Sequence, residues 1–404
     1  MGMLERGITP EFFDQSGLKR LTPEQERTVS LHYKSELLSG LRGDAKSVAM
    51  SPSGLSSTEL NSLREGSEAL VIEIGGTNLY GARVAIQCGN PFISASHKGL
   101  LPTTIFKNAQ EFYKLVADNM RPVLKEHEPD AIGIVYSFPG MAIKVGRDVD
   151  VISPENLPKE FVIPGISNKR VGQALRETLH NLYGAKVDVP TVVLNDTVAV
   201  LFSAGAKIGG VVGTGFNLAM ETPKGIVNSE SGGFAIALTN RFAEAVDKQS
   251  NNVGKQLAEK QVSGLYLGEQ MRLIVDELKQ QGLNIDIPSK TITAKTISDL
   301  LQYQGTDGAQ LILQEAASRL RDRSAQIVGI MAGTIIASFP EVFDADVIKF
   351  PVEGSLFWRM PGYSEKVMEV AQRLSQREIR FLNIVGAGRI GAAVAALGNI
   401  PQKV

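Results

Sequence analysis

The residues best suited to chemistry are two glycine-threonine turns and an aspartate that lies between them in the chain. Residues 75–78 read Gly-Gly-Thr-Asn after the apolar stretch Val71–Ile74, and residues 213–215 read Gly-Thr-Gly. Glycine has no Cβ, so phosphate can approach the main-chain N–H groups of such a turn, and threonine adds a hydroxyl donor. Asp196 follows the apolar residues 192–194 and could accept a proton from an attacking hydroxyl. Two phosphate-binding turns around one carboxylate favour phosphoryl transfer.

Each of these features also has a purely structural interpretation. Any hairpin can turn on glycines, and Asp196 could be only a helix cap, because Asn-Asp-Thr at residues 195–197 is good helix-capping chemistry. Residues 386–391 match the dinucleotide fingerprint GxGxxG. That fingerprint needs a further strand with an acidic residue about 20 positions on, and the chain ends at Val404. We therefore expect no nicotinamide chemistry, although a strand–glycine–helix unit of this kind could line an adenosine pocket.

The predicted elements place these residues at strand ends. Thr22-Pro23-Glu24-Gln25 has the pattern of a capping box, so a helix should run from there to about Gly40. Apolar and β-branched runs predict strands at Val71–Ile74, Val84–Ile86, Ala131–Phe138, Val192–Leu194, Gly210–Val212, Val347–Val352 and Arg380–Val385. The helical spacing of apolar residues predicts helices at Asn108–Met120, Asn168–Leu182, Gln256–Gln280, Ala309–Ser338 and Ser364–Leu374. The basic run Arg319–Arg323 is expected to lie on a solvated helix face. Interleaved strands and helices predict an α/β fold with two related lobes and a cleft between them.

Composition narrows the function classes. The chain has 404 residues, of which 43% are hydrophobic and 21% charged, and a length of this size suggests two lobes. The formal net charge of −1 gives no reason to expect nucleic acid or an anionic membrane as a partner. Cys88 is the only cysteine, which excludes intrachain disulfides and cysteine-clustered zinc sites. No apolar run reaches about 18 residues and no signal peptide is evident, so the expected location is cytoplasmic.

Taken in order, segments of the chain resemble those of the hexokinase family, in the actin-like ATPase superfamily, over nearly the whole length. The matching segments are Ala49–Pro52, Ile74–Leu79, Tyr136–Pro139, Glu155–Phe161, Asn195–Ala199, Gly213–Asn217, Asn228–Phe234, Gly254–Lys260, Ser263–Glu269, Val352–Leu356 and Gly386–Arg389. The resemblance implies an actin-like ATPase (ribonuclease H-like), two-lobed hexokinase fold with an interlobe cleft. It also implies ATP- and Mg²⁺-dependent phosphorylation of the 6-hydroxyl of a hexose, with glucose as the expected sugar.

The resemblance assigns roles to individual residues. Asp196 becomes the general base, and Lys159 the cation that stabilises the transition state. The implied sugar contacts are Ser137, Lys159, Asn195, Asp196, Asn217, Glu230 and Glu259. The implied nucleotide contacts are Gly75, Gly76, Thr77, Asn78, Gly213, Thr214, Gly215, Gly264, Ser298, Gly354, Ser355 and Gly388. Mg²⁺ would be held mostly through water near Asp196 and Glu73.

The resemblance also divides the chain. Residues 1–65 would form an N-terminal helical segment on the large lobe, 66–195 the small lobe, 196–385 the large lobe and 386–404 a C-terminal helix. The expected partners are a hexose and a nucleotide, without nucleic acid or membrane, and a homodimer is left open.

Several positions depart from the family's pattern. Glu73 stands where the family has aspartate, Tyr80 where it has arginine, Pro158 where it has threonine, Ser231 where it has tryptophan and Leu265 where it has lysine. They leave two alternatives open. One is a catalytically weak or inactive sugar-binding or sensing protein of the same fold. The other is a kinase for another hexose or an N-acetylhexosamine.

Overall fold

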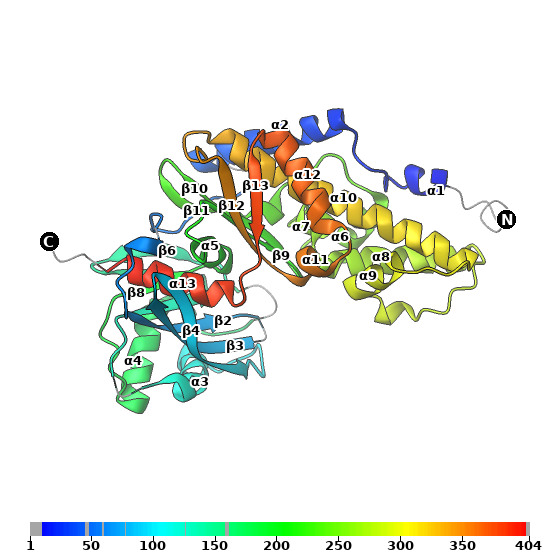
Figure 1. Cartoon of the computed structure of the whole chain (residues 1–404). Coiled ribbons are helices and arrows are strands. Elements are labelled where there is room, and N and C mark those ends of the chain that lie inside the picture. Colours follow the sequence, from blue (N-terminus) through cyan, green and yellow to red (C-terminus); the bar gives the residue numbers. More distant parts are fainter. Residues whose placement is uncertain are drawn as a thin grey trace.

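The computed structural model describes residues 10–44, 48–58, 60–76, 78–125, 127–157 and 161–400, and its strands form two sheets (Figure 1). The first sheet has the strand order β4-β3-β2-β5-β8-β7-β6 and the second has β1-β11-β10-β9-β12-β13. The strands of the first sheet are β2 (Glu68–Ile74), β3 (Asn78–Gln87), β4 (Asn90–Leu100), β5 (Ala131–Tyr136), β6 (Met141–Val145), β7 (Asp148–Ile152) and β8 (Thr191–Leu194). Those of the second are β1 (Ser51–Pro52), β9 (Ile208–Val212), β10 (Phe216–Thr222), β11 (Gly225–Asn228), β12 (Val347–Glu353) and β13 (Glu378–Leu382).

The two sheets repeat one plan. In each, an antiparallel meander (β2, β3 and β4, or β9, β10 and β11) is followed by two parallel strands (β5 and β8, or β12 and β13). The expectation of two related α/β lobes is therefore confirmed. The proposed domain boundaries stay a prediction. β1, from the N-terminal segment, pairs with β11 of the second sheet.

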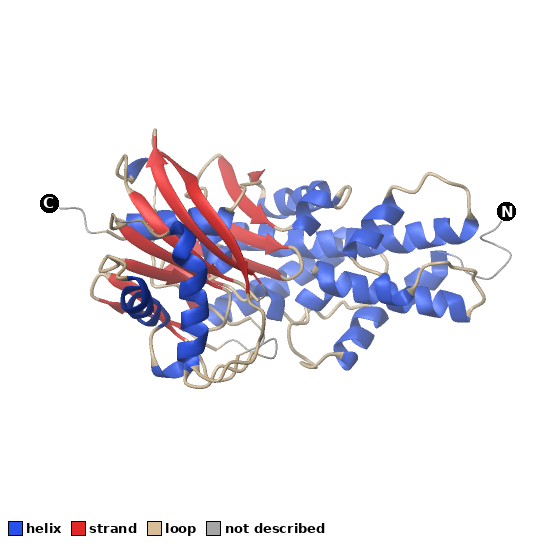
Figure 2. Ribbon diagram, turned by 90° about the horizontal axis from the view of Figure 1, so that it is seen from below, coloured by secondary structure: helices blue, strands red, loops and turns tan. Residues whose placement is uncertain are grey.

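Helices cover the sheets in layers. They are α1 (Pro10–Gln15), α2 (Pro23–Arg42), α3 (Ala109–Met120), α4 (Val171–Tyr183), α5 (Asp196–Phe202), α6 (Arg241–Gln249), α7 (Glu259–Val262), α8 (Gly264–Gln280), α9 (Ala294–Leu301), α10 (Gly308–Ser338), α11 (Ser355–Arg359), α12 (Tyr363–Ser375) and α13 (Ala387–Gly398). Helices α5 and α13 pack on each other between the sheets, where α13 contacts β2 and β5 and α5 contacts β9 and β10. Figure 1 shows both helices at this junction, and Figure 2 shows the strands gathered toward one end of the molecule and many of the helices toward the other. Strand β8 leads into α5 with only Asn195 between them.

Local signals located several elements well. The capping box at Thr22 is present, with its hydroxyl accepting the Gln25 N–H at 3.3 Å and its own N–H donating to Gln25 Oε1 at 2.9 Å. The β2–β3 hairpin and the long helix α10 are also confirmed, although β3 begins at Asn78, six residues before the predicted Val84.

One predicted helix and one predicted surface were wrong. The predicted helix Gln256–Gln280 is two helices, because Ser263 is extended (φ −78°, ψ 153°) where α7 ends and α8 begins. The arginine run is not solvated, since the side chains of Arg319 and Arg321 are only 15% and 18% exposed and Arg323 is 4% exposed. Arg323 donates to the carbonyls of Lys19 at 3.2 Å and Leu238 at 2.5 Å. Helix α10 is buried on most of its circumference, so its arginines bond to neighbouring segments instead of water.

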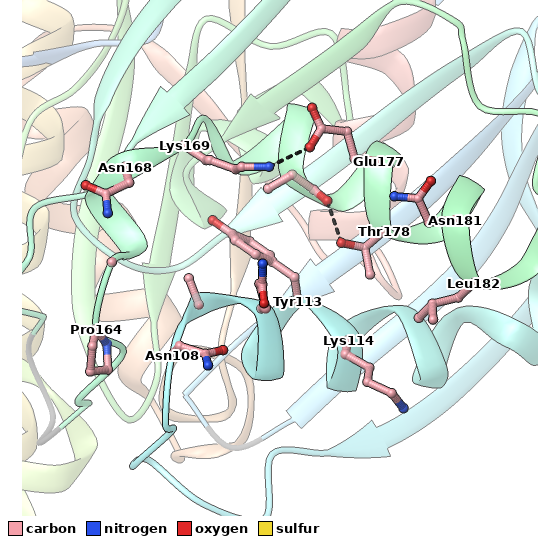
Figure 3. Close-up of a pocket in the computed structure, with 14 residues that line it drawn as sticks. Asn108, Tyr113, Lys114, Pro164, Asn168, Lys169, Glu177, Thr178, Asn181 and Leu182 are labelled. Carbon is pink, nitrogen blue, oxygen red and sulfur yellow. Dashed lines mark hydrogen bonds and ion pairs between the residues drawn. The ribbon is translucent and has the colours of Figure 1, made fainter.

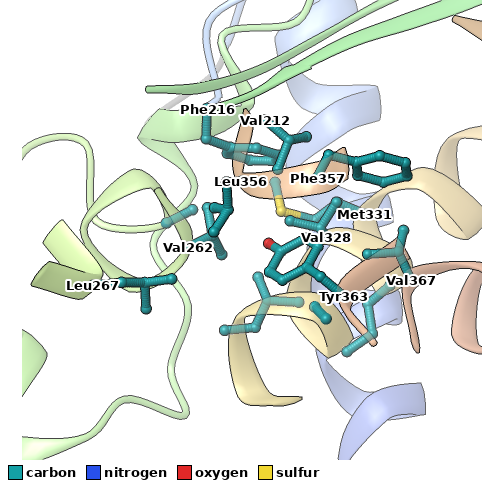
Figure 4. Packing of buried hydrophobic residues seen from close by; sticks show 14 of the residues in the cluster. Val212, Phe216, Val262, Leu267, Val328, Met331, Leu356, Phe357, Tyr363 and Val367 are labelled. Carbon is teal, nitrogen blue, oxygen red and sulfur yellow. The ribbon is translucent and has the colours of Figure 1, made fainter. Parts of the chain in front are cut away.

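The core of the second sheet supports the second glycine turn. Val212 and Phe216 flank residues 213–215 and are buried with Leu356 and Phe357 of α11 (Figure 4). Tyr363 is fully buried in the same cluster, and its hydroxyl lies 2.7 Å from Ser324 Oγ. Close packing on both sides of the turn limits how far it can move.

Candidate active site

Asp196 begins helix α5 directly after strand β8 and also lies on a cavity wall. Asn195 Oδ1 accepts the N–H of Thr197 at 2.9 Å, and Asp196 Oδ1 accepts the same N–H at 2.8 Å and the Thr197 hydroxyl at 3.2 Å. The N-cap of α5 is therefore Asn195, one residue before Asp196, for which the capping interpretation was made. The cap does not exclude a chemical role for Asp196, because it leaves the Asp196 carboxylate at the N-terminal end of the helix.

A cavity of about 1040 Å³ brings most of the predicted sugar residues together. Its wall includes Ser137, Asn195, Asp196, Asn217, Glu230 and Glu259, with Thr214 and Gly215 of the second turn. Ser137 comes from the first-sheet side, where its N–H donates to the Ile74 carbonyl at 3.1 Å. The others come from α5, from β10 and from segments beside the second sheet. Lys159 lies outside the described residues.

The polar wall is pre-oriented by its own hydrogen bonds. Asn217 Nδ2 donates to Asn228 Oδ1 at 2.7 Å, and Asn228 Nδ2 donates to Glu230 Oε1 at 2.9 Å. Glu259 Oε1 accepts the N–H of Phe216 at 3.3 Å. Because these bonds fix the side chains before any ligand binds, less side-chain conformational entropy is lost on binding.

Glu230 has a strained backbone and a buried support that sequence reasoning missed. Its φ of 43° is in the left-handed region, which is uncommon for a residue other than glycine. The next residue, Ser231, shares a 2.7 Å hydrogen bond with the hydroxyl of Tyr33 on α2, and a further one with Ser229. Tyr33 is fully buried and its ring packs on Phe234 at 4.9 Å between centroids. The departure at Ser231 was visible in the sequence, whereas its distant partner was not.

The second glycine turn is closed by its own hydrogen bond and is contacted by two other segments. The Gly213 N–H donates to the Gly215 carbonyl at 2.9 Å, and the Gly213 carbonyl accepts the Gly264 N–H at 2.7 Å. Gly354 (φ 131°) lies so close that a Cβ placed on Gly213 would be 3.2 Å from its Cα. The hydrogen bond from Gly264 to Gly213 explains the break at Ser263, because it ties the start of α8 to the turn. The predicted nucleotide residues Gly264, Gly354 and Ser355 therefore surround it.

The remaining predicted nucleotide residues lie in different places. In the first turn the Gly75 N–H donates to the Asn78 carbonyl at 3.0 Å, while Thr77 lies outside the described residues. Gly388 is on α13, and its N–H donates to the carboxylate of Glu353. Ser298 is on α9, where it donates to the Arg359 carbonyl at 3.4 Å, and it does not line the cavity.

Acidic groups from both sheets share the region around Asp196. Burial raises the pKa of Glu73 to about 7, helped by the charges of Glu353 and Asp196 and opposed by that of Arg389. Burial also raises the pKa of Glu230 to about 7, with the charges of Asp196 and Glu259 adding to the effect. The pKa of Glu353 is raised by burial and by Asp196. Each carboxylate thus makes its neighbours harder to ionise, which is typical of a site that holds a cation or moves a proton.

The donor set suits a hydrated magnesium ion. Within the described ranges, no three His, Cys, Asp or Glu side chains are grouped closely enough to hold a metal directly. Mg²⁺ keeps several of its waters and needs few protein ligands. The raised pKa values of Glu73 and Glu353 show that positive charge near them would be favoured.

The cavity wall also contains residues that the sequence did not single out. They include Gln249 at the end of α6 and the polar residues Ser250, Asn251, Asn252 and Gln256 between α6 and α7. Their run of amides was visible in the sequence, although nothing local indicated which surface they would face.

A second hollow, of about 540 Å³, lies between α3 and α4 (Figure 3). Lys169 pairs with Glu177 at 2.7 Å across it, and Thr178 donates to the Ala174 carbonyl at 2.7 Å. None of the predicted site residues lines it. In the part of the chain that is described, no helix is long and apolar enough to cross a membrane.

Comparison with known proteins identifies the family. Two family models, both described as "Hexokinase", match residues 17–206 and 207–398. Hexokinase-3 of Homo sapiens is 26% identical over 94% of this chain and 46% of its own length. The hexokinase of Kluyveromyces lactis is 23% identical over 93% of this chain and 89% of its own. The chain thus spans about half the length of the mammalian relatives that it matches.

Solved structures show the same fold. A crystal structure of a hexokinase superposes with a TM-score of 0.81 at 20% identity, covering 97% of this chain and 99% of its own. The structure of the Schistosoma mansoni hexokinase complexed with glucose superposes with a TM-score of 0.74 at 21% identity, covering 95% of this chain and 99% of its own. The actin-like ATPase fold expected from the sequence is confirmed. With both family models together matching residues 17–398, the chain belongs to the hexokinase family.

Proposed function

We propose that the protein is an ATP-dependent hexokinase that transfers the γ-phosphoryl group to the 6-hydroxyl of a hexose, with glucose as the expected sugar. The observation that carries the proposal is the position of Asp196. Its carboxylate is on the wall of the cavity that also holds Thr214 of the second turn and the polar side chains Ser137, Asn217, Glu230 and Glu259.

Asp196 would act as the general base. A carboxylate within hydrogen-bond reach of the sugar hydroxyl would accept its proton as the oxygen attacks phosphorus.

The polyol would be recognised by the hydrogen-bonded wall. Asn217, Asn228 and Glu230 form a chain of amides and a carboxylate that presents both donors and acceptors. A sugar lacking one of the matched hydroxyl groups would leave a buried partner unpaired, which costs affinity.

The donor phosphates would lie between the two turns. Thr214 and the main chain of residues 213–215 would contact one phosphate, and residues 75–78 another, with Lys159 near the transferred group. Mg²⁺, when bound, would neutralise charge on the β- and γ-phosphates, with Glu73 and Asp196 contacting it mostly through water. The cytoplasmic location and a homodimer stay predictions.

A second candidate is a sugar-binding or sensing protein of the same fold with little or no turnover. It is favoured by Glu73, whose pKa is raised by burial and by the charges of Glu353 and Asp196, and by Tyr80 and Leu265 where the family has cations. A kinase for another hexose or an N-acetylhexosamine is the third candidate, for which the serine at position 231 is the motivating change.

The test is a sugar panel with the wild type and the variant Asp196→Asn. ADP release would be followed by a coupled assay with ATP, other nucleotides and polyphosphate as donors. We expect ATP and glucose to give turnover, and Asp196→Asn to reduce it by about 10²- to 10⁴-fold. Sugar affinity, measured by calorimetry, should change far less. Asp188→Asn is the matched control, because Asp188 is 94% exposed.

The outcomes separate the candidates. Full activity of Asp196→Asn would exclude Asp196 as the base. Sugar binding without turnover for any sugar and donor would support the sensing protein. Turnover with another sugar alone would support the third candidate.

A further inference from the structure

A stacked arginine lies beside the first glycine turn. In the β2–β3 hairpin, Glu73 faces Tyr80 across the two strands, and the next pair, Ile74 and Leu79, directly precedes the turn. The guanidinium of Arg389 lies over the Tyr80 ring, 4.7 Å from its centroid. Its Nε is 3.5 Å from Glu73 Oε2. Helix α13, from the other end of the chain, thus places a cation near the first turn.

The same arginine is also close to the second sheet. Glu353, the last residue of β12, accepts the Gly388 N–H, and the charge of Arg389 lowers its pKa against the effect of burial. The residue after it, Gly354, is the one that packs against Gly213 of the second turn. Arg389 therefore lies between the strand ends that lead to the two turns.

Arg389 has bonding capacity that the described residues leave unused. Its side chain is 18% exposed, and its buried Nε has no hydrogen-bond partner among them. Arginine carries five N–H donors in a planar fork that matches phosphate oxygens. Stacking on Tyr80 holds the fork in place without using those donors.

The charged residues around Arg389 indicate which kind of ligand its unused N–H donors would bind. Glu73, Asp196 and Glu353 are all acidic, and they would repel the phosphates of a nucleotide. A positive group among them would lower that repulsion, and Arg389 is the basic residue whose charge acts on both Glu73 and Glu353.

We propose that Arg389, stacked on Tyr80, binds the phosphate chain of the nucleotide donor on the side of the first turn. This assignment rests on the proposed kinase function. It makes Tyr80 a positioning residue for a cation that arrives from α13, because position 80 itself supplies none.

The experiment measures nucleotide binding separately from turnover. Dissociation constants for ATP in the presence of Mg²⁺, and for adenosine, would be measured by calorimetry for the wild type and for Arg389→Gln. Loss of charge-assisted bonds should weaken ATP binding about 10- to 100-fold and leave adenosine binding unchanged. Arg389→Lys keeps the charge and loses the fork, so it should fall between the two. Arg64→Gln is the control, since Arg64 is 72% exposed and pairs with Asp130.

A relocated cation gives the sharpest test. In the double variant Tyr80→Arg with Arg389→Gln, the positive charge returns to the hairpin, and ATP affinity should recover at least in part. Thermal unfolding and sugar affinity of each variant would show whether the fold is intact.

The outcomes distinguish the two proposals. Wild-type protein that neither binds ATP nor transfers phosphate would overturn the kinase function. Wild-type protein that binds ATP, together with an intact Arg389→Gln that binds it equally well, would overturn only the role of Arg389. Equal weakening of ATP and adenosine would also overturn it, because it would indicate a structural effect.

Discussion

The buried carboxylate of Glu230 should make the stability of the protein depend on pH. Burial and the charges of Asp196 and Glu259 raise its pKa from 4.5 to about 7. The substitution Glu230→Gln removes the ionisable group. It keeps a side-chain oxygen of similar position that can still accept the Asn228 N–H, which is 2.9 Å away in the wild type. The left-handed backbone is equally uncommon for both residues, so strain should cancel in the comparison.

The sign follows from the direction of the shift. Because the pKa of Glu230 is higher in the folded state, its contribution to stability is complete below the unfolded pKa of 4.5 and is lost as the pH rises through about 7. One pKa unit corresponds to about 1.4 kcal/mol, so the wild type should lose up to about 3 kcal/mol through this group. The glutamine variant should lose none of it.

Urea unfolding of sugar-free protein from pH 5 to pH 8 measures the effect. We expect the variant to have nearly wild-type stability at pH 5 and to gain on the wild type by up to about 3 kcal/mol at pH 8. Glu155→Gln is the control, because hydrogen bonds from Ser167 and Gly165 lower the pKa of Glu155 below its usual 4.5. Its stability difference from the wild type should therefore stay nearly constant between pH 5 and pH 8. A stability difference between Glu230→Gln and wild type that stays constant over this range would refute the reasoning.

Two further substitutions test how the site is supported. Tyr33→Phe removes the hydroxyl bonded to Ser231 at 2.7 Å and should cost about 1 kcal/mol in urea unfolding, with weaker sugar binding in calorimetry if this bond positions Glu230. An unchanged midpoint would show that water replaces the bond. Gly391→Ala should destabilise by about 1–3 kcal/mol, because its Cβ would be 1.6 Å from the Ala199 carbonyl oxygen of α5. On the same helix, the Cβ introduced by Gly388→Ala would be 3.8 Å from its nearest atom, which is ordinary contact. Thermal unfolding should therefore show a clearly smaller loss of stability for Gly388→Ala than for Gly391→Ala.

Sequence reasoning located the elements whose signals lie within a few neighbouring residues. The capping box at Thr22 marks the start of α2 because its partners are three positions apart. The hairpin of β2 and β3 is marked by β-branched runs around glycines. The Asn-Asp-Thr segment marks the start of α5, although the cap is Asn195 and not Asp196. Interleaved strands and helices in both halves of the chain also indicated two related lobes.

Features that depend on distant partners could not be predicted in this way. The break at Ser263 arises because Gly264 and Leu265 bond to the carbonyls of Gly213 and Thr214. Helical periodicity over residues 256–280 contains no trace of that contact. The arginines of α10 likewise have the composition of a solvated surface, and they are covered only because the segment around Lys19 and Leu238 packs over Arg323.

Two of the departures from the family's pattern have such distant partners. Tyr80 is covered by Arg389 from the C-terminal helix, and Ser231 bonds to Tyr33 from the N-terminal helix. Residues in contact contribute to stability and binding in a coupled way, so a change at one position alters what its partner can do. Restoring the family residue at position 80 or 231 alone would leave the partner in place, with a second cation beside Arg389 or a bulky ring against buried Tyr33. Each pair therefore has to be exchanged together, and a non-additive result in the double variant would show that the departures are compensated within this chain.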